Sequence, residues 1–191
     1  MRSLLRLVSG CSAGSFFNPI FAGNKKNNMD TSELIIKMEL DAWNAQISAS
    51  NSLLASLSDE DLMKEISPGR NRGIYLLGHL TAIHDLMFPL LRLGEAQYPG
   101  LGPIFVQMPD RAVAEIPTAK ELREKWKLTN ERLSGHFSKL TAGDWFSRHN
   151  NITDADFVNE PHRNRLNVLI SRTNHLSYHR GQLALLAKKA D

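Results

Sequence analysis

The sequence predicts an all-α fold, a four-helix bundle with long connections. Three observations support this fold class. Apolar residues recur every three or four positions in four segments, no segment alternates as a half-buried strand would, and two long stretches without such spacing separate the later segments. The four predicted helices span about 31–57, 71–93, 118–140 and 165–186. Two long crossings between packed helices are a known variant of the four-helix bundle.

The first predicted helix begins at a capping box, formed by Asp30 and Glu33. Small and medium apolar residues then follow at spacings of four and three. We expect this stripe to face the core, and its members are Leu34, Met38, Ala42, Ala45, Ala49 and Leu53.

The second predicted helix follows the firm break at Ser67-Pro68-Gly69 and is apolar on nearly all sides. Such a helix needs neighbours on several faces, and Pro89 should kink it or mark its last turn. The third helix begins at a second capping box, formed by Thr118 and Glu121. Its expected inward stripe consists of Leu122, Trp126, Thr129, Leu133 and Phe137.

The last predicted helix carries a pair of histidines, His175 and His179, four residues apart. That spacing places both imidazoles on one face. Ser171 and Gln182 share this face, and apolar residues close it at both ends. The pattern favours a polar pocket inside the bundle. Two histidines at this spacing are a common way to present two ligands to one transition metal, although surface or hydrogen-bonded core histidines would show the same spacing.

A third ligand has to come from elsewhere in the chain. The second helix offers His79 and His84, which are five residues apart and therefore point about 140° away from each other. Both helix faces are apolar, so periodicity does not choose between them. Gly78 would let another backbone approach closely beside His79, which favours His79 slightly.

Two segments together resemble the DinB-like (YfiT-like) metalloenzyme superfamily, over about residues 30–188. They are Leu76-Leu77-Gly78-His79-Leu80 and Asn174-His175-Leu176-Ser177-Tyr178-His179-Arg180-Gly181-Gln182. The resemblance implies a four-helix bundle, often a homodimer, whose three histidines bind a divalent metal, usually zinc or nickel. Carried over residue by residue, it gives His79, His175 and His179 as ligands.

The resemblance also brings in thiol transferases that use bacillithiol or mycothiol, so a low-molecular-weight thiol is the expected co-substrate. Three imidazoles would leave a coordination position open for such a thiol or for water. We therefore predict a thiol transferase or a hydrolase acting on a small molecule. The alternative is a non-catalytic metal-binding or stress-response interaction protein. Gln182 and Ser171 are candidates to orient an imidazole or a bound water, and an inter-helix hydrogen bond is an equal alternative for Gln182.

Charge and composition exclude several classes of function. Residues 1–28 carry four basic residues and no acid, so the remaining chain has a net charge of −1 and lacks the basic face that nucleic-acid binding requires. No apolar run approaches the roughly 20 residues that span a bilayer. Cys11 is the only cysteine, which excludes an intrachain disulfide. We expect a cytoplasmic domain over 29–191, preceded by an extension over 1–28 that is disordered or a non-native leader.

Overall fold

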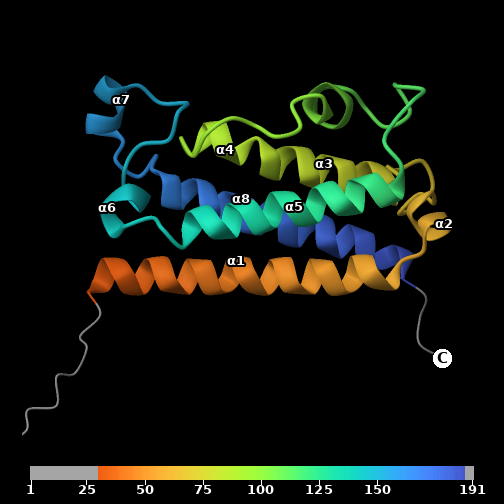
Figure 1. The fold of residues 1–191 in the computed structure, drawn as a ribbon, viewed down its shortest axis with the longest axis horizontal. Helices are drawn as coiled ribbons and strands as arrows, with labels where there is room; N and C mark the ends of the chain where they lie inside the picture. The colour runs from red at the N-terminus through yellow and green to blue at the C-terminus, as the bar shows by residue number, and fades with distance from the viewer. Residues whose placement is uncertain (1–29, 188–191) are drawn as a thin grey trace, which may run out of the picture.

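Four long helices form the bundle in a computed structural model, which describes residues 30–187. They are α1 (Thr31–Ser56), α3 (Gly73–Asp85), α5 (Ala119–Phe137) and α8 (Arg165–Leu183). Figure 1 shows them lying side by side along the long axis of the molecule. Residues 30–187 contain no β-strand, only two isolated bridges, and the predicted all-α class is confirmed. The predicted extension over 1–28 lies outside the described residues.

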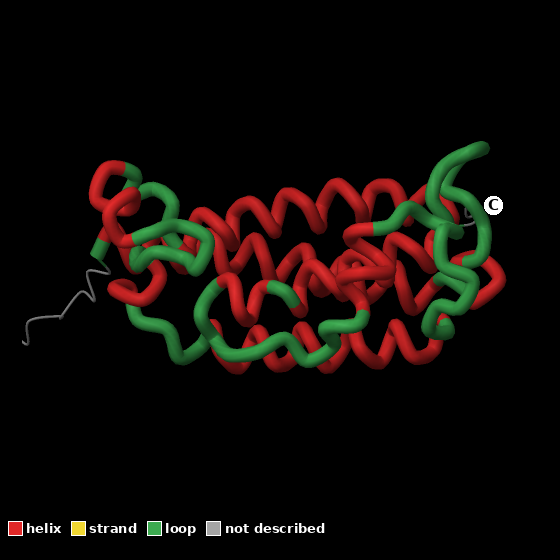
Figure 2. Tube along the Cα trace, turned by 90° about the horizontal axis from the view of Figure 1, so that it is seen from above, coloured by secondary structure: helices red, strands yellow, loops and turns green. Residues whose placement is uncertain are grey.

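Short helices interrupt the connections between the long ones. They are α2 (Asp59–Leu62), α4 (Met87–Leu90), the π-helix η1 (Pro103–Gln107), α6 (Ala142–Trp145), α7 (Asp154–Asn159) and the 3-10 helix η2 (Ala184–Leu186). Figure 2 shows that the loops gather at the two ends of the bundle and along one side. No helix within 30–187 is long and apolar enough to cross a membrane.

Both predicted capping boxes are present. At α1 the Asp30 side chain accepts from the backbone of the first turn while Glu33 reaches back to the Asp30 amide, and Thr118 and Glu121 do the same at α5. Each box satisfies amides that the helix itself leaves without partners, an effect of about 1 kcal/mol per cap. These local signals therefore fix where α1 and α5 begin.

The predicted inward stripe of α1 is wrong for its first four members, whereas Ala49 is half-buried and Leu53 packs against the core. Leu34 and Met38 are 48% and 64% exposed, and Ala42 and Ala45 are exposed as well. The helix instead turns a second apolar stripe inward, whose buried or half-buried members are Ile36, Leu40, Trp43, Ile47 and Leu54. The second stripe holds the larger side chains, and burying them removes more apolar surface from water.

The second predicted helix is divided at Leu86. Helix α3 ends at Asp85, and α4 is a separate turn that contains Pro89. Proline has no amide hydrogen to donate to the carbonyl four residues earlier, so the ladder cannot continue through this point. The Asp85 carboxylate instead accepts hydrogen bonds from the amides of Gln97 and Tyr98, at 2.8 and 2.7 Å.

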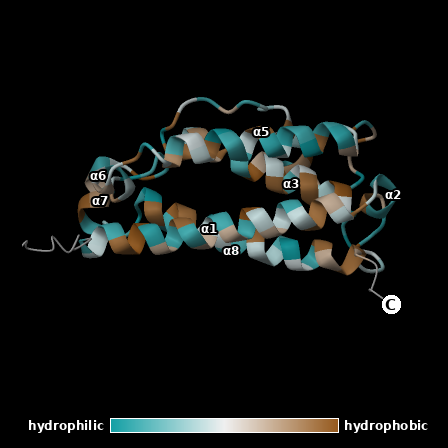
Figure 3. Ribbon diagram, turned by 60° about the horizontal axis from the view of Figure 1, so that its bottom comes forward, coloured by the Kyte–Doolittle hydropathy of each residue, from teal (hydrophilic) through white to brown (hydrophobic). Residues whose placement is uncertain are grey.

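The four long helices pack as two pairs, α1 with α8 and α3 with α5, and the pairs meet where α3 lies against α8. Figure 3 shows α3 as a largely apolar helix, while the visible face of α5 is mostly hydrophilic. All five residues of the stripe predicted for α5 are buried. The contact between α3 and α8 positions the histidines described next.

Candidate metal centre

Three histidine side chains converge where α3 lies against α8. His79 projects from α3, and His175 and His179 project from successive turns of α8. The Nε2 atom of His175 lies 3.2 Å from Nε2 of His79 and 3.1 Å from Nε2 of His179. The structure thus brings together the three residues that the resemblance implied as ligands.

Hydrogen bonds to the outer nitrogens fix which ring nitrogen carries the proton. His79 donates from Nδ1 to the carbonyl oxygen of Phe105, at 2.8 Å, and His179 donates from Nδ1 to Oε1 of Gln182, at 2.7 Å. Both partners are oxygen acceptors, so in the neutral rings the hydrogens sit on Nδ1 and the Nε2 lone pairs face the cluster. Outer partners of this kind orient imidazoles that bind a metal.

The cluster fits a divalent cation on the chemistry of its donors. Nε2 of His175 can offer a hydrogen to only one of its two neighbours, so at least one of the two short contacts would set lone pair against lone pair. A cation placed among the three atoms would turn all three lone pairs into ligands, and three imidazoles suit zinc, nickel and related metals.

Burial keeps these imidazoles neutral. It is the main cause that lowers the pKa of all three, and the neighbouring His179, His79 and Arg172 add to it for His175, whose pKa falls to about 4. An imidazole must be unprotonated to bind a metal. At neutral pH the rings are therefore in the form that ligation needs.

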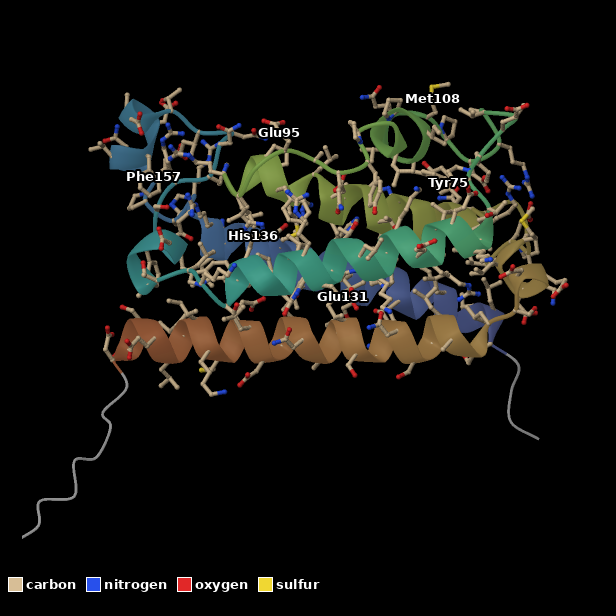
Figure 4. All side chains as sticks on the ribbon, in the orientation of Figure 1. Tyr75, Glu95, Met108, Glu131, His136 and Phe157 are labelled. Atoms are coloured by element: carbon tan, nitrogen blue, oxygen red, sulfur yellow. The ribbon has the colours of Figure 1, made fainter. Side chains whose placement is uncertain are left out.

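The long connection after α4 reaches the cluster through η1. The ring of Phe105 packs on Gly78, where a Cβ atom would lie only 2.4 Å from it. This contact places the Phe105 carbonyl oxygen against His79. Tyr75 ties the following residues down by donating its hydroxyl to the carbonyl oxygen of Met108, at 2.7 Å (Figure 4). The lack of a side chain at Gly78 thus makes room for an aromatic ring, whereas the sequence indicated that another backbone segment would approach there.

The structure places His84 far from a ligand role. Its ring is fully buried between Trp43 and Trp126, with ring centroids 4.8 Å away on each side. It donates from Nδ1 to Oδ1 of Asn130, at 2.8 Å, because the amide nitrogen of Asn130 already donates to a backbone carbonyl. His84 is a core residue, and it does not belong to the cluster.

The cluster lies at the edge of the buried face of α8, and the expectation of a pocket inside the bundle is wrong. The three histidines are half-buried, whereas the fully inward positions of this helix are apolar or Thr173. They are Leu166, Leu169, Thr173, Leu176 and Leu183. A site at this seam can be reached from solvent without opening the core.

The two other predicted site residues differ in position. Gln182 orients His179, as described, and donates from its amide nitrogen to the hydroxyl oxygen of Tyr178 at 3.1 Å. Both of these contacts lie within α8, so they are not the alternative inter-helix bond. Ser171 is exposed and forms no described hydrogen bond to the cluster. Catalytic roles for Gln182 and Ser171 stay predictions.

Sequence reasoning missed Arg172. This residue is half-buried on α8 and lies on the same helix face as the histidine pair, three residues before His175. Its charge contributes to the lowered pKa values of His79 and His175. The available signal was its spacing, because residues 172, 175 and 179 fall on one helical stripe.

The sequence profile of the DinB superfamily matches residues 42–183, which include all three histidines. The chain belongs to the DinB superfamily. Two solved structures share the fold of this DinB-superfamily chain. A DinB-like protein from Bacillus cereus ATCC 10987 superposes with a TM-score of 0.56 and 20% identity, over 78% of this chain and 89% of that one. A conserved protein from Enterococcus faecalis gives 0.54 and 14%, over 83% and 96%. No curated protein matches the chain.

Proposed function

We propose that this protein is a metal-dependent enzyme, a thiol transferase or a hydrolase that acts on a small molecule. The convergence of three Nε2 atoms carries the proposal, because no cysteine, aspartate or glutamate of residues 30–187 joins the cluster as a fourth ligand. Structural zinc sites usually have four protein ligands, and catalytic sites have three. Zinc or nickel is the proposed metal, and a low-molecular-weight thiol is the proposed co-substrate.

Several residues of the chain would hold and surround such a cation. When bound, the cation supplies Lewis-acid chemistry, which favours deprotonation of a thiol or a water. His79 is held by the Phe105 carbonyl and His179 by Gln182, so both rings are oriented before substrate arrives. The hydroxyl of Tyr178 belongs to the same network. This residue is 64% exposed.

The runner-up is a non-catalytic metal-binding protein with a role in stress response. One observation favours it: no carboxylate of residues 30–187 lies within the histidine cluster, so none in direct contact with the three ligands could accept a proton. A metal that serves structure alone should be required for folding. The enzyme proposal instead expects the metal-free protein to fold, and to melt at a moderately lower temperature because the metal binds only the native state.

Elemental analysis and activity measurements test the proposal together. Purified protein should hold about one equivalent of metal, His79→Ala and His175→Ala should lose it, and His136→Ala should keep it, because His136 packs on Phe88 away from the cluster. Metal-loaded protein should accelerate thiol addition to an electrophile, or hydrolysis of a small amide or ester. Metal binding without either metal-dependent activity across a panel of thiols and substrates would favour the runner-up.

A homodimer also remains a proposal, and sedimentation of the purified chain measures it.

A further inference from the structure

Arg172 has no counter-charge in the part of the chain that the structure describes. The side chain is half-buried, its Nε atom is buried without a hydrogen-bond partner, and none of the ion pairs among residues 30–187 includes it. Burial lowers the pKa of its guanidinium, and no carboxylate offsets that effect. Leaving a partly buried charge without a partner is costly.

Two other partly buried arginines of this protein, Arg72 and Arg123, have partners. Arg165, whose Nε atom is also buried without a hydrogen-bond partner, has Asp144 as a nearby counter-charge. Arg72 forms several hydrogen bonds to the carboxylate of Asp110, including one of 2.7 Å, and its pKa is raised by them. Arg123 donates to the backbone carbonyl oxygens of Leu54 and Leu57. Arg172 differs from all three, because its fork of donors is left for something outside the described chain.

A pocket of about 260 Å³ lies against Arg172. Its other lining residues are uncharged, and they are Leu86, Pro89, Leu90, Asn150 and Asn151. Leu86 follows His79 by seven residues and therefore lies on the same face of that helical stretch. Arg172 precedes His175 by three residues of α8, about 4.5 Å along the axis. The pocket thus lies next to the histidine cluster along α8, at the seam that this helix forms with the end of α3 and with α4.

We propose that this pocket binds the carboxylate of the substrate, with Arg172 as the residue that recognises it. The inference rests on the proposed function and names its substrate class: a small organic acid whose reacting group lies a few bonds from the carboxylate. A planar guanidinium matches a carboxylate with two parallel hydrogen bonds. The pocket contains one cation and an apolar wall, which suits a monoanion on a short hydrocarbon chain better than a doubly charged phosphate.

Arg172 is a specificity-determining residue in this arrangement. The carboxylate fixes one end of the substrate in the pocket, so that the rest of the molecule extends along the seam toward His175. Holding a reactant in place in this way raises its effective concentration at the reacting group. The apolar side chains of Leu86 and Leu90 line the pocket and lower the local dielectric around the ion pair, which strengthens it.

Binding of pentanoate to the metal-free protein tests the proposal, because no metal is then available to hold the carboxylate. Titration followed by NMR should show saturable binding in the millimolar range for the native protein. Arg172→Met should weaken it at least tenfold, Arg172→Lys should weaken it less, and uncharged pentanamide should not bind. Arg180→Met is the matched control. This substitution removes the same charge from the same helix, but the Arg180 side chain donates a hydrogen bond to Gln46 of α1. Its affinity for pentanoate should stay within twofold of the native value.

A stability measurement separates recognition from a structural role. Arg172→Met removes an unpaired, half-buried charge and keeps much of the side-chain volume, so its melting temperature should equal or exceed that of the native protein. Pentanoate binding that is unchanged in Arg172→Met, or pentanamide that binds as well as pentanoate, would overturn the proposal. Inorganic phosphate that binds more tightly than pentanoate would overturn the carboxylate assignment. A protein that binds no metal but still binds pentanoate through Arg172 would refute the proposed function and leave this pocket standing.

Discussion

Two histidines on one helix have opposite environments, and the difference arises from neighbours that lie far away in the sequence. His79 faces α8 and the Phe105 carbonyl. His84 is enclosed by Trp43 of α1 and Trp126 of α5, and full burial lowers its pKa to about 3. The same residue type therefore serves as a candidate ligand at one position and as a polar core residue at the other.

The buried His84 should make the stability of the metal-free protein depend on pH. The pKa of His84 in the native protein lies below the value of about 6.5 in the unfolded chain. In acid the unfolded state therefore binds a proton at this residue, while the native state stays unprotonated there. The contribution of His84 to the stability is therefore fully present above about pH 6.5 and is lost as the pH falls towards 3. Between pH 7 and pH 5 this residue alone should lower the free energy of unfolding by about 2 kcal/mol, measured by urea denaturation.

The variant His84→Phe isolates this contribution. Phenylalanine keeps a ring between the two tryptophans and cannot take up a proton. The variant is expected to be less stable at pH 7, because Asn130 loses its partner, but to lose about 2 kcal/mol less than the native protein on going to pH 5. Equal losses in the two proteins would show that His84 is protonated in the native state or reached by water.

At the scale of single residues, the three members of the histidine cluster could be predicted from the sequence, but the residues that surround His84 and the position of Arg172 could not. The spacing of His175 and His179 is a local property of a helix, and the family resemblance supplied His79. The two tryptophans around His84 come from different helices, and no local pattern places them there. Arg172 was missed because an arginine in a helix is usually solvated, and its lack of a counter-charge is visible only once the fold brings α3 alongside α8.

Among the elements, the contact of α3 with η1 controls the outer partner of His79. Gly78→Ala would set a methyl group against the ring of Phe105, at 2.4 Å before any adjustment. Alanine favours the helix by about 1 kcal/mol, whereas overpacking costs about 1–3 kcal/mol. We expect a net destabilisation of up to about 2 kcal/mol together with weaker metal binding, because η1 must move and carry the Phe105 carbonyl with it.

Gly135→Ala is the matched control for that substitution. Gly135 also lies in a long helix, α5, but a Cβ atom there would meet nothing within 4 Å. This change should stabilise the protein by about 0.5–1 kcal/mol and leave metal binding alone. Thermal melting and metal titration of both variants measure the two effects. Stabilisation by Gly78→Ala would mean that η1 is not packed on α3 in solution.

Helix α1 illustrates where element-level prediction fails. Its sequence contains two apolar stripes, one of small residues with Leu34 and Met38 and one with Trp43. Periodicity alone gives both stripes the same weight. Burial favours the stripe with larger side chains, and the choice becomes clear only when the partner helix is known. Helix α5 carries charged residues around a single stripe, and for that helix the same reasoning gave the correct face.

At the scale of the molecule, the described bundle should fold without the residues before it. Residues 1–28 hold a charge of +4 and no helical apolar stripe. A chain that begins at Met29 should therefore melt cooperatively, within a few degrees of the full-length protein, as calorimetry can measure. A large drop in the melting temperature would show that the leader packs on the bundle.

The pairing of α1 with α8 joins the two ends of the described chain. Arg180 reaches Gln46 and Thr173 reaches Glu39, each across 134 residues of sequence. A ribosome makes α1 first and α8 last. During synthesis Trp43 can meet its neighbours on α3 and α5 early, whereas Glu39 and Gln46 have no α8 partner until that helix has left the exit tunnel, and only then can the bundle close.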